Sequence, residues 1–521
     1  MIRGRRIATR LLTEIRSLAP ATHDPTTLPA QLPGMSRSAH DSPRPASKEG
    51  KAMHPDLLND NILKTQYAVR GELYTRAQEL AKSGGEVIYT NIGNPQQLGQ
   101  EPLVFNRQVL ALLLAPFLLD HPSASALFPR EAIDRARELL AAFGGRMGAY
   151  SDARGAPAIR QQVAAFIEAR DGQPADPEDI YLTDGASVGV KYALNALIRD
   201  GNDGILCPIP QYPLYSAAIQ LFGGKLVPYY LEEDAGWDLN LEALRGAVKK
   251  ARAEGTVLRA LAFINPGNPT GQVLTRETLR ELIAFAHDEG LVLLADEVYQ
   301  PNIYQDEKPF VSAKRVLREM GEPWASSVEL ASFHTVSKGM LGECGLRGGY
   351  VEWVNIHPGA QAELYKVASV NLCPNTVGQA TVSLMVAPPT GDSEAARQYA
   401  KQYEDSLASL RRRAHVMTDA FNGLEGASCN FTEGAMYSFP RLHLPAKAIQ
   451  AAKEAGKDPD TFYCLALLAD TGIVTVPGSG FGQVEGTFHL RTTILPQEDV
   501  MHEFVDKLRT FHKSFMAKYK D

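Results

Sequence analysis

The sequence predicts an α/β protein with a mostly parallel sheet, followed by a smaller α+β domain. Three observations predict this fold class. From about residue 155, apolar strand-like runs alternate with amphipathic helix-like runs, which is the pattern of an α/β domain. The run GLVLLA at 290–295 is apolar on both faces, as in a central parallel strand. The last third has one long helical pattern and then short strand-like runs.

Length and composition indicate a soluble protein with more than one domain. At 521 residues, the chain is too long for one hydrophobic core and should divide into two or three domains. A net charge of -7 and a pI near 6.0 give no reason to expect nucleic acid or an anionic membrane as a partner. The five cysteines are far apart and form no C-x-x-C pair, which favours a reducing compartment over a disulfide framework or a zinc site.

The first 50 residues differ in composition from the rest. Residues 1–20 hold five arginines against one acid, Glu14, with apolar residues between them. On a helix this pattern gives a basic amphipathic face, which is typical of a transit peptide. We expect residues 1–50 to be a leader that directs the protein to the mitochondrial matrix. A disordered basic tail on a cytoplasmic protein and a chloroplast address are the alternatives.

The elements of the predicted large domain follow in order. The run Val109–Leu119 is too short to span a bilayer, and we expect a buried helix there. DIYLTDGAS predicts a strand and a turn, followed by a helix that stops at Gly201. VLRALAFINPGNPTG predicts a strand that enters a Pro/Gly turn, after which Thr275 caps the next helix.

The C-terminal part is predicted as a second, α+β domain. Apolar residues between Tyr403 and Leu424 recur in alternating steps of four and three, which favours a long helix packed on its own neighbours over a short coiled coil. AMYSFPRLHL, GIVTVPG and GTFHLRTTIL predict short strands. The expected boundaries are 1–50 for the leader, 51–124 for an N-terminal arm and part of the small domain, 125–385 for the large domain and 386–521 for the rest of the small domain.

Polar residues at the ends of the predicted strands form a candidate site. Asp296 ends an apolar strand, where a carboxylate is costly unless it has a partner. Asn268 follows the preceding strand, and Ser187 lies where a helix begins, a place that binds anions. The carboxyl ends of parallel strands gather ligands at one edge of a sheet. Lys338 and Arg347, in HTVSKGMLGECGLRGGY, add an amine and a guanidinium to this collection.

Pyridoxal phosphate is the cofactor that such a collection of groups suits. Its aldehyde condenses with a lysine amine, a carboxylate keeps its ring nitrogen protonated, and an anion pocket holds its phosphate. The lysine, once the substrate amine displaces it, can move a proton as general acid and base.

The order of the motifs NPGNPTG, ADEVY, SFHTVSKG and GLRGGY resembles the fold type I, class I/II aminotransferases. YTNIGNPQ, TVSKGMLGECGLRGGYVE and GTFHLRTTILP resemble the alanine branch of that family. The resemblance covers roughly residues 55–515. It implies a large domain with a mostly parallel mixed sheet, a smaller α+β domain and a homodimer with shared active sites.

The resemblance also implies roles for individual residues. Lys338 would join its amine to the cofactor, and Asp296 would pair with the pyridine nitrogen. The other implied contacts are Tyr299 and Asn268 with the 3-oxygen, Tyr212 stacked on the ring, and Ala186, Ser187, Thr335, Ser337 and Arg347 with the phosphate. Arg491 would bind the substrate's α-carboxylate bidentately, and Gly93 would let the backbone close over it. Tyr150 would reach the phosphate of the neighbouring subunit. Lys338 and Arg347 are nine residues apart, one more than in many relatives, so the contact of Arg347 stays open.

The expected reaction is a ping-pong transfer from L-alanine to 2-oxoglutarate, which gives pyruvate and L-glutamate. The alternative is glutamate:glyoxylate transfer or another pyridoxal phosphate reaction of amino acids. A transcription regulator with an aminotransferase-like domain is disfavoured, because the leader is too short and too rich in Pro and Ser for a helix-turn-helix. A nicotinamide dehydrogenase is disfavoured because GSGFGQVEG lacks the G-x-G-x-x-G pattern.

Overall fold

The computed structural model describes residues 46–67 and 71–520. Most of the predicted leader, residues 1–45, lies outside them. The described residues belong to two units, the first ending at Leu58 and the second beginning at Asn59. In the first unit, η2 (Pro55–Leu57) begins after His54, whose side chain accepts a hydrogen bond from the backbone N–H of Asp56. The second unit contains all the elements described below.

An eight-stranded sheet forms the centre of the second unit. Its order is β2 (Ile180–Thr183), β9 (Gly349–Val354), β8 (Leu330–Thr335), β7 (Val292–Asp296), β6 (Val257–Ile264), β3 (Asp203–Ile209), β4 (Lys225–Glu232) and β5 (Asp238–Leu239). The five strands from β8 to β4 pair in parallel, and β9 and β5 run antiparallel to their neighbours. The predicted mostly parallel sheet is confirmed, and β7 is central, as its two apolar faces predicted.

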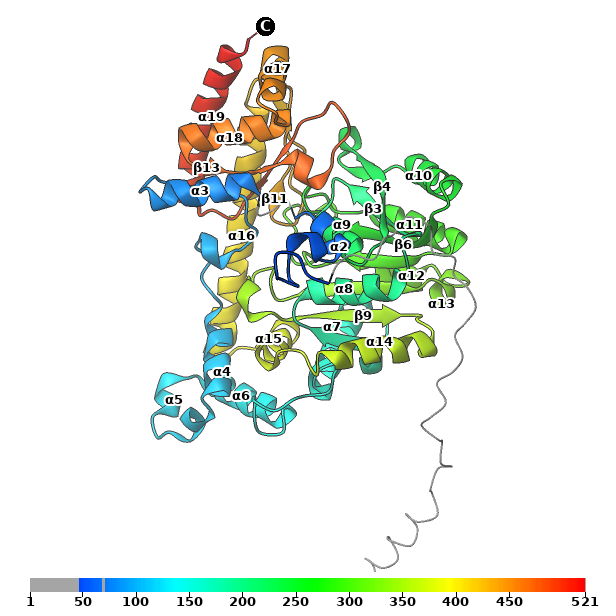
Figure 1. Cartoon of the computed structure of the whole chain (residues 1–521). Coiled ribbons are helices and arrows are strands. Elements are labelled where there is room, and N and C mark those ends of the chain that lie inside the picture. The colour runs from blue at the N-terminus through cyan, green and yellow to red at the C-terminus, as the bar shows by residue number, and fades with distance from the viewer. Residues whose placement is uncertain (1–45, 68–70, 521) are drawn as a thin grey trace, which may run out of the picture. The chain divides into compact units, whose positions relative to one another are not determined.

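Helices cover both faces of this sheet (Figure 1). One face packs on the apolar residues of α8 (Ala186–Leu197), α9 (Leu214–Leu221) and α14 (Pro358–Val370). The other packs on α10 (Leu241–Ala253), α11 (Arg276–Glu289), α12 (Ala313–Glu319) and the nearby α13 (Trp324–Ser327). Thr275 caps α11 by accepting a hydrogen bond from the backbone N–H of Thr278, which confirms the predicted cap.

A second core lies at the β2 end of the sheet. It joins residues of α4 (Val104–Leu114), α6 (Arg130–Ala142), α7 (Pro157–Asp171) and α15 (Thr376–Val386), next to the short α5 (Ala124–Leu127). The expectation of a buried helix over Val109–Leu119 is wrong at its end. α4 ends at Leu114 because Ala115, which precedes Pro116, leaves the helical conformation. Leu114 and Phe117 are exposed.

The C-terminal part holds the long helix predicted around Tyr403–Leu424. α16 (Glu394–Asn422) is longer than its apolar pattern and runs from α4 toward α17 (Ala446–Glu454), α18 (Pro459–Thr471) and α19 (Glu498–Lys518) (Figure 1). Its buried residues share a core with α18 and α19, so the packed helix is confirmed over the coiled coil. The short helices α2 (Asp60–Lys64) and α3 (Glu72–Lys82) precede the large sheet in the chain.

Short strand pairs complete this part of the chain. β15 (Leu490–Thr493) lies between β11 (Tyr437–Ser438) and β14 (Val476–Pro477). β1 (Ile88–Tyr89) pairs with β13 (Ile473–Val474), and β10 (Ala427–Ser428) pairs with β12 (Arg441–Leu442). All three predicted strand runs therefore contain strands, although each strand is shorter than its run. Within the described residues, no helix is long and apolar enough to cross a membrane.

The predicted stop of α8 at Gly201 is wrong. The helix ends at Leu197, and Ile198 already has extended backbone angles. Asp203 accepts hydrogen bonds from the backbone N–H and the guanidinium of Arg199. This local pairing turns the chain toward β3 before it reaches the glycine.

Candidate active site

A cavity of about 480 Å³ opens at the carboxyl ends of the parallel strands. Every residue predicted for the site except Tyr150 lines this cavity: Gly93, Ala186, Ser187, Tyr212, Asn268, Asp296, Tyr299, Thr335, Ser337, Lys338, Arg347 and Arg491. Asp296 ends β7, and Ser337 and Lys338 follow β8. The strand-end rule therefore predicted correctly which side chains meet.

Asp296 is buried and has one oxygen free to bind a ligand. Its Oδ2 accepts a hydrogen bond from the hydroxyl of Tyr215, 3.1 Å away. Its Oδ1 has no hydrogen-bond partner among the described residues. Burial raises the pKa of Asp296 to about 6, although the bonds from Tyr215 and the backbone of Val298 act in the opposite direction. A protonated ring nitrogen placed beside Oδ1 would supply the missing partner.

Lys338 lines the same cavity as Asp296 and lies in the turn after β8. Its Nζ donates a hydrogen bond of 2.9 Å to the carbonyl of Gly93 and lies 5.6 Å from the centre of the Tyr299 ring. The turn is fixed by Thr335, whose hydroxyl donates to the carbonyl of Gly348 and accepts from the backbone N–H of Ser337. The amine is thus held inside the cavity and is not a solvated surface charge.

The N-terminus of α8 and Arg347 form an anion cradle. α8 begins at Ala186, and no side chain caps the helix by a hydrogen bond, so its first backbone N–H groups can bind an anion. Arg347 donates from Nη2 to the carbonyl of Asp184, 2.9 Å away. A Cβ on Gly185, which has a φ of +87°, would lie 2.4 Å from the same nitrogen. Glycine is therefore required for this close approach.

The loop before Arg347 accommodates the extra residue between Lys338 and Arg347. Residues Cys344–Leu346 form the short helix η8, and Arg347 itself has a left-handed φ of +53°. Arg347 also donates from Nη1 to the carbonyl of Cys344. This tight turn brings the guanidinium back to the start of α8 despite the longer spacing.

Arg491 also lines the cavity and is almost fully buried. Nη1 donates to Oδ1 of Asn268 at 3.2 Å, and Nη2 donates to the carbonyl of Asn91 at 2.5 Å. Its Nε has no partner within the described part of the chain. The guanidinium carbon lies 4.2 Å from the centre of the Tyr437 ring and 4.8 Å from that of the Phe481 ring. Its remaining N–H groups can bind a carboxylate in a fixed orientation.

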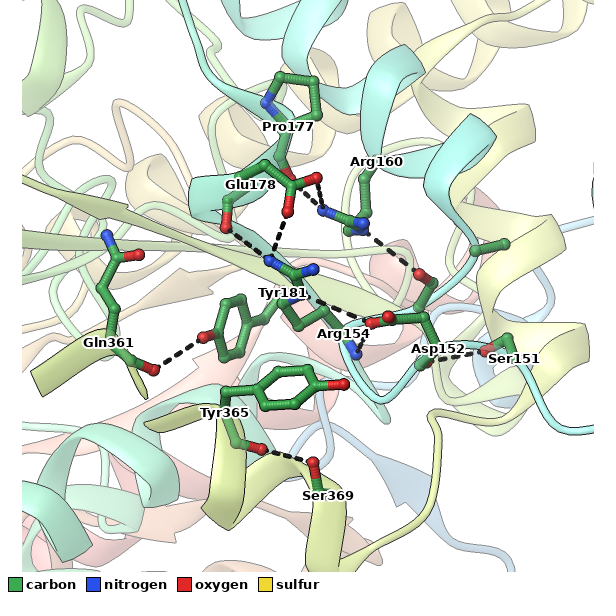
Figure 2. A network of polar contacts seen from close by, with 12 residues as sticks. Ser151, Asp152, Arg154, Arg160, Pro177, Glu178, Tyr181, Gln361, Tyr365 and Ser369 are labelled. Atoms are coloured by element: carbon green, nitrogen blue, oxygen red, sulfur yellow. Dashed lines mark hydrogen bonds and ion pairs between the residues drawn. The ribbon is translucent and has the colours of Figure 1, made fainter. Parts of the chain in front are cut away.

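Tyr150 is the one predicted residue that does not line the cavity. It is 77% exposed and belongs to a loop held by the polar network in Figure 2. Arg154 pairs with Glu178 at 2.7 Å and with Asp152 at 3.4 Å, and it lies over the ring of Tyr365. Arg160 binds Glu178 from the other side at 3.0 Å. The network fixes the loop while the Tyr150 side chain remains exposed.

Sequence reasoning did not single out Tyr67, Cys344 and Tyr437, which line the cavity, or Tyr215, which binds Asp296. The hydroxyls of Tyr67 and Tyr212 lie 2.9 Å apart. Tyr67 lines the cavity but belongs to no recognisable motif. Tyr215 lies three residues after Tyr212 in PQYPLY, but it belongs to α9 (Leu214–Leu221) whereas Tyr212 precedes the helix, so helical spacing gives no signal that the two lie together. Tyr437 lies in a strand that was predicted correctly, but without its pairing partner.

The cavity fits pyridoxal phosphate by its own chemistry. It offers an amine at Lys338, an unpartnered carboxylate oxygen at Asp296 and an anion cradle at α8 and Arg347. These three features match the aldehyde, the ring nitrogen and the phosphate of the cofactor. None of these three contacts uses Arg491, whose guanidinium can bind a second, carboxylate-bearing molecule.

Three comparisons place this geometry among known proteins. The family model described as aminotransferase class I and II matches residues 119–508. Glutamate–glyoxylate aminotransferase 1 of Arabidopsis thaliana is 58% identical over 469 residues, which cover 90% of this chain and 98% of that protein. The mitochondrial alanine aminotransferase 1 of the same plant is 51% identical over 476 residues, which cover 89% and 88%.

A solved structure confirms the predicted fold class. The structure of an alanine aminotransferase from Pyrococcus furiosus matches with a TM-score of 0.71 and 23% identity, and the match covers 88% of this chain and all of that one. At this identity the likeness concerns the fold.

Proposed function

The chain belongs to the class I and II aminotransferases, and we propose on that premise that it transfers the amino group of L-alanine to 2-oxoglutarate. The products are pyruvate and L-glutamate. The chain is a transaminase that depends on pyridoxal phosphate, as the enzymes of this family do. When bound, this cofactor supplies an electron sink for the substrate's α carbon. The roles of the individual residues below are part of the proposal.

The residues of the cavity divide the work between the cofactor and the substrate. Oδ1 of Asp296 holds the proton of the ring nitrogen, and the α8 N-terminus with Arg347 holds the phosphate. Arg491 binds the α-carboxylate of each substrate in turn, because both substrates carry the same group. Lys338 lines the same cavity, and its Nζ would accept the proton of the α carbon of the amino donor and, in the second half of the reaction, donate a proton to the α carbon of the oxo acceptor.

One observation supports this function most strongly: a single cavity holds the Lys338 amine, the free Oδ1 of Asp296 and the buried guanidinium of Arg491. A cofactor site alone does not need Arg491, whose buried charge is costly without an anionic partner. We infer that the partner is the substrate carboxylate.

Glutamate–glyoxylate transfer is the second candidate, and the 58% identical relative favours it. The two reactions share the five-carbon half, glutamate with 2-oxoglutarate. They differ in the small partner, which is alanine with pyruvate in one and glycine with glyoxylate in the other. The deciding experiment measures kcat/KM for alanine, serine and glycine as donors to 2-oxoglutarate, and for pyruvate and glyoxylate as acceptors from glutamate. The alanine assignment requires the highest values for alanine and pyruvate.

Two further parts of the proposal concern assembly and location. The exposed Tyr150, on its fixed loop, supports a homodimer in which this side chain completes the neighbouring site. Light scattering of the purified protein tests the dimer, and a monomer with full activity would refute it. The basic composition of residues 1–20 supports import into mitochondria. A fluorescent fusion of residues 1–50 that stayed outside mitochondria would refute that location.

The predicted domain boundaries, at 124/125 and 385/386, belong to the proposal as well. We expect the small domain to close on the large one when Arg491 binds a carboxylate, which would exclude water from the cavity.

A further inference from the structure

Tyr437 contacts both Arg491 and Tyr299 in the cavity. It is buried on β11, which pairs antiparallel with β15 so that Tyr437 lies opposite Thr493. Arg491, two residues before Thr493, therefore lies diagonally across on the same face. This register places the Tyr437 ring 4.2 Å from the guanidinium carbon of Arg491. The guanidinium carbon also lies 4.8 Å from the centre of the Phe481 ring, so two aromatic rings contact Arg491.

The Tyr437 hydroxyl lies beside Tyr299 and Gly93. It lies 3.3 Å from the hydroxyl of Tyr299, and the two rings meet edge to face. A Cβ on Gly93 would lie 1.8 Å from the Tyr437 oxygen and 3.3 Å from Nζ of Lys338. The hydroxyl therefore occupies the space beside Gly93 that any other residue at that position would fill.

We propose that Tyr437 is a positioning residue that couples the two ends of the site: its ring orients Arg491 for the substrate carboxylate, and its hydroxyl orients that of Tyr299. This inference rests on the proposed function, in which Arg491 binds the carboxylate and Tyr299 binds the 3-oxygen of the cofactor.

The charges around Tyr437 agree with this arrangement. Burial acts to raise the pKa of Tyr437, but the positive charges of Lys338 and Arg491 outweigh burial, so the pKa is lowered even with Cys344 nearby. Burial raises the pKa of Tyr299 well above its usual range. Tyr299 donates to Tyr437 in this structure, but a hydroxyl has only one proton to donate. When Tyr299 gives that proton to the 3-oxygen of the cofactor, the Tyr437 hydroxyl becomes the donor to the Tyr299 oxygen. The lowered pKa of Tyr437 favours this role, which gives the Tyr299 hydroxyl a defined direction.

Two substitutions separate the ring from the hydroxyl. Tyr437→Phe keeps the ring and removes the hydroxyl, whereas Tyr437→Leu removes both. Glutarate, which has the carbon chain of 2-oxoglutarate but no reacting group, reports on Arg491 when its binding is measured by calorimetry. The pH midpoint of the visible absorbance of the loaded protein reports on the groups around the cofactor's 3-oxygen. Neither readout depends on turnover.

The expected results differ between the variants. Tyr437→Leu should weaken glutarate binding by about tenfold, the loss expected for a desolvated cation–π contact. Tyr437→Phe should bind glutarate within about twofold of the wild type, because the ring remains. Both variants should raise the absorbance midpoint by about 0.5 to 1 pH unit, because a poorly oriented Tyr299 stabilises the 3-oxygen less.

Tyr399→Leu is the matched control, because Tyr399 is also a buried tyrosine but packs on Phe105, away from the cavity. It should lower thermal stability and leave both readouts unchanged. An unchanged midpoint in Tyr437→Phe, or unchanged glutarate binding in Tyr437→Leu, would overturn the role of Tyr437. If the leucine variant does not fold, the midpoint of the phenylalanine variant decides. A wild-type protein that takes up no pyridoxal phosphate would overturn the proposed function together with this inference.

Discussion

The hydroxyl of Tyr215 donates a hydrogen bond of 3.1 Å to Oδ2 of Asp296, and Oδ1 of the same carboxylate has no hydrogen-bond partner among the described residues. The carboxylate is thus held by a residue of helix α9. A group that is oriented in advance loses less freedom on binding.

Tyr215→Phe should weaken the binding of pyridoxal phosphate by roughly tenfold, since a hydrogen bond to a charged group is worth about 1.5–3 kcal/mol. The cofactor's dissociation constant, measured from its absorbance, checks this. Tyr229→Phe is the control, because its buried hydroxyl donates to the carbonyl of Ala262 and does not contact Asp296. Equal cofactor affinities in both variants would contradict the role of Tyr215.

The burial of Asp296 should appear in the stability of the cofactor-free protein. The pKa of Asp296 is raised from 3.8 to about 6 in the folded state, so the folded protein binds more protons than the unfolded chain between these values. Its contribution to the free energy of unfolding therefore falls as the pH rises from about 4 to 6, by about 3 kcal/mol in total. Urea unfolding of the wild type and of Asp296→Asn over this range measures the difference. A constant difference between the two proteins would show that Asp296 does not titrate there.

Arg491→Lys should raise the KM of both the amino and the oxo substrate by about 100-fold, because a lysine cannot hold a carboxylate with two parallel N–H groups. Arg413→Lys is the matched control. Arg413 is also buried, but it donates to the carbonyls of Leu495 and Pro496 and does not line the cavity. Its replacement should lower stability and leave both KM values within about twofold. Similar KM changes in the two variants would contradict a specific role for Arg491.

Gly185→Ala should weaken phosphate binding. The new Cβ would lie 2.4 Å from Nη2 of Arg347, on a backbone with a φ of +87° that alanine disfavours. We expect the affinity for pyridoxal phosphate to fall at least tenfold, while the affinity for pyridoxal, which lacks the phosphate, changes little. Gly290→Ala, also at positive φ but with open space around it, controls for backbone strain. Equal losses for both cofactor forms would contradict the anion cradle.

The parts of the site that follow from local sequence were predictable. Asp296 and Lys338 end or follow apolar strands, and the strand pattern itself placed them at one edge of the sheet. The N-terminus of α8 was predictable for the same reason. Where the sequence misled, a local contact overrode the pattern, as when Arg199 binds Asp203 and ends α8 before Gly201.

The remaining parts depend on contacts between segments far apart in the chain. Tyr437 meets Arg491 because β11 pairs with β15 in one register, and strand patterns do not specify which strands pair. The Tyr215 hydroxyl reaches Asp296 because α9 packs on the sheet next to β7. Pro116 indicated that α4 ends near Leu114. The exposure of the Leu114 side chain depends on packing partners that the sequence does not reveal.

The most direct test of the account is a single turnover of the loaded protein with L-alanine alone. Without 2-oxoglutarate, each site can pass on one amino group and must then stop. If the protein transaminates L-alanine through Lys338, it should release one equivalent of pyruvate per cofactor-loaded subunit with a matching change in the visible absorbance. Lys338→Ala should show neither signal. A fully loaded wild-type protein that released no pyruvate from L-alanine would contradict the proposed function.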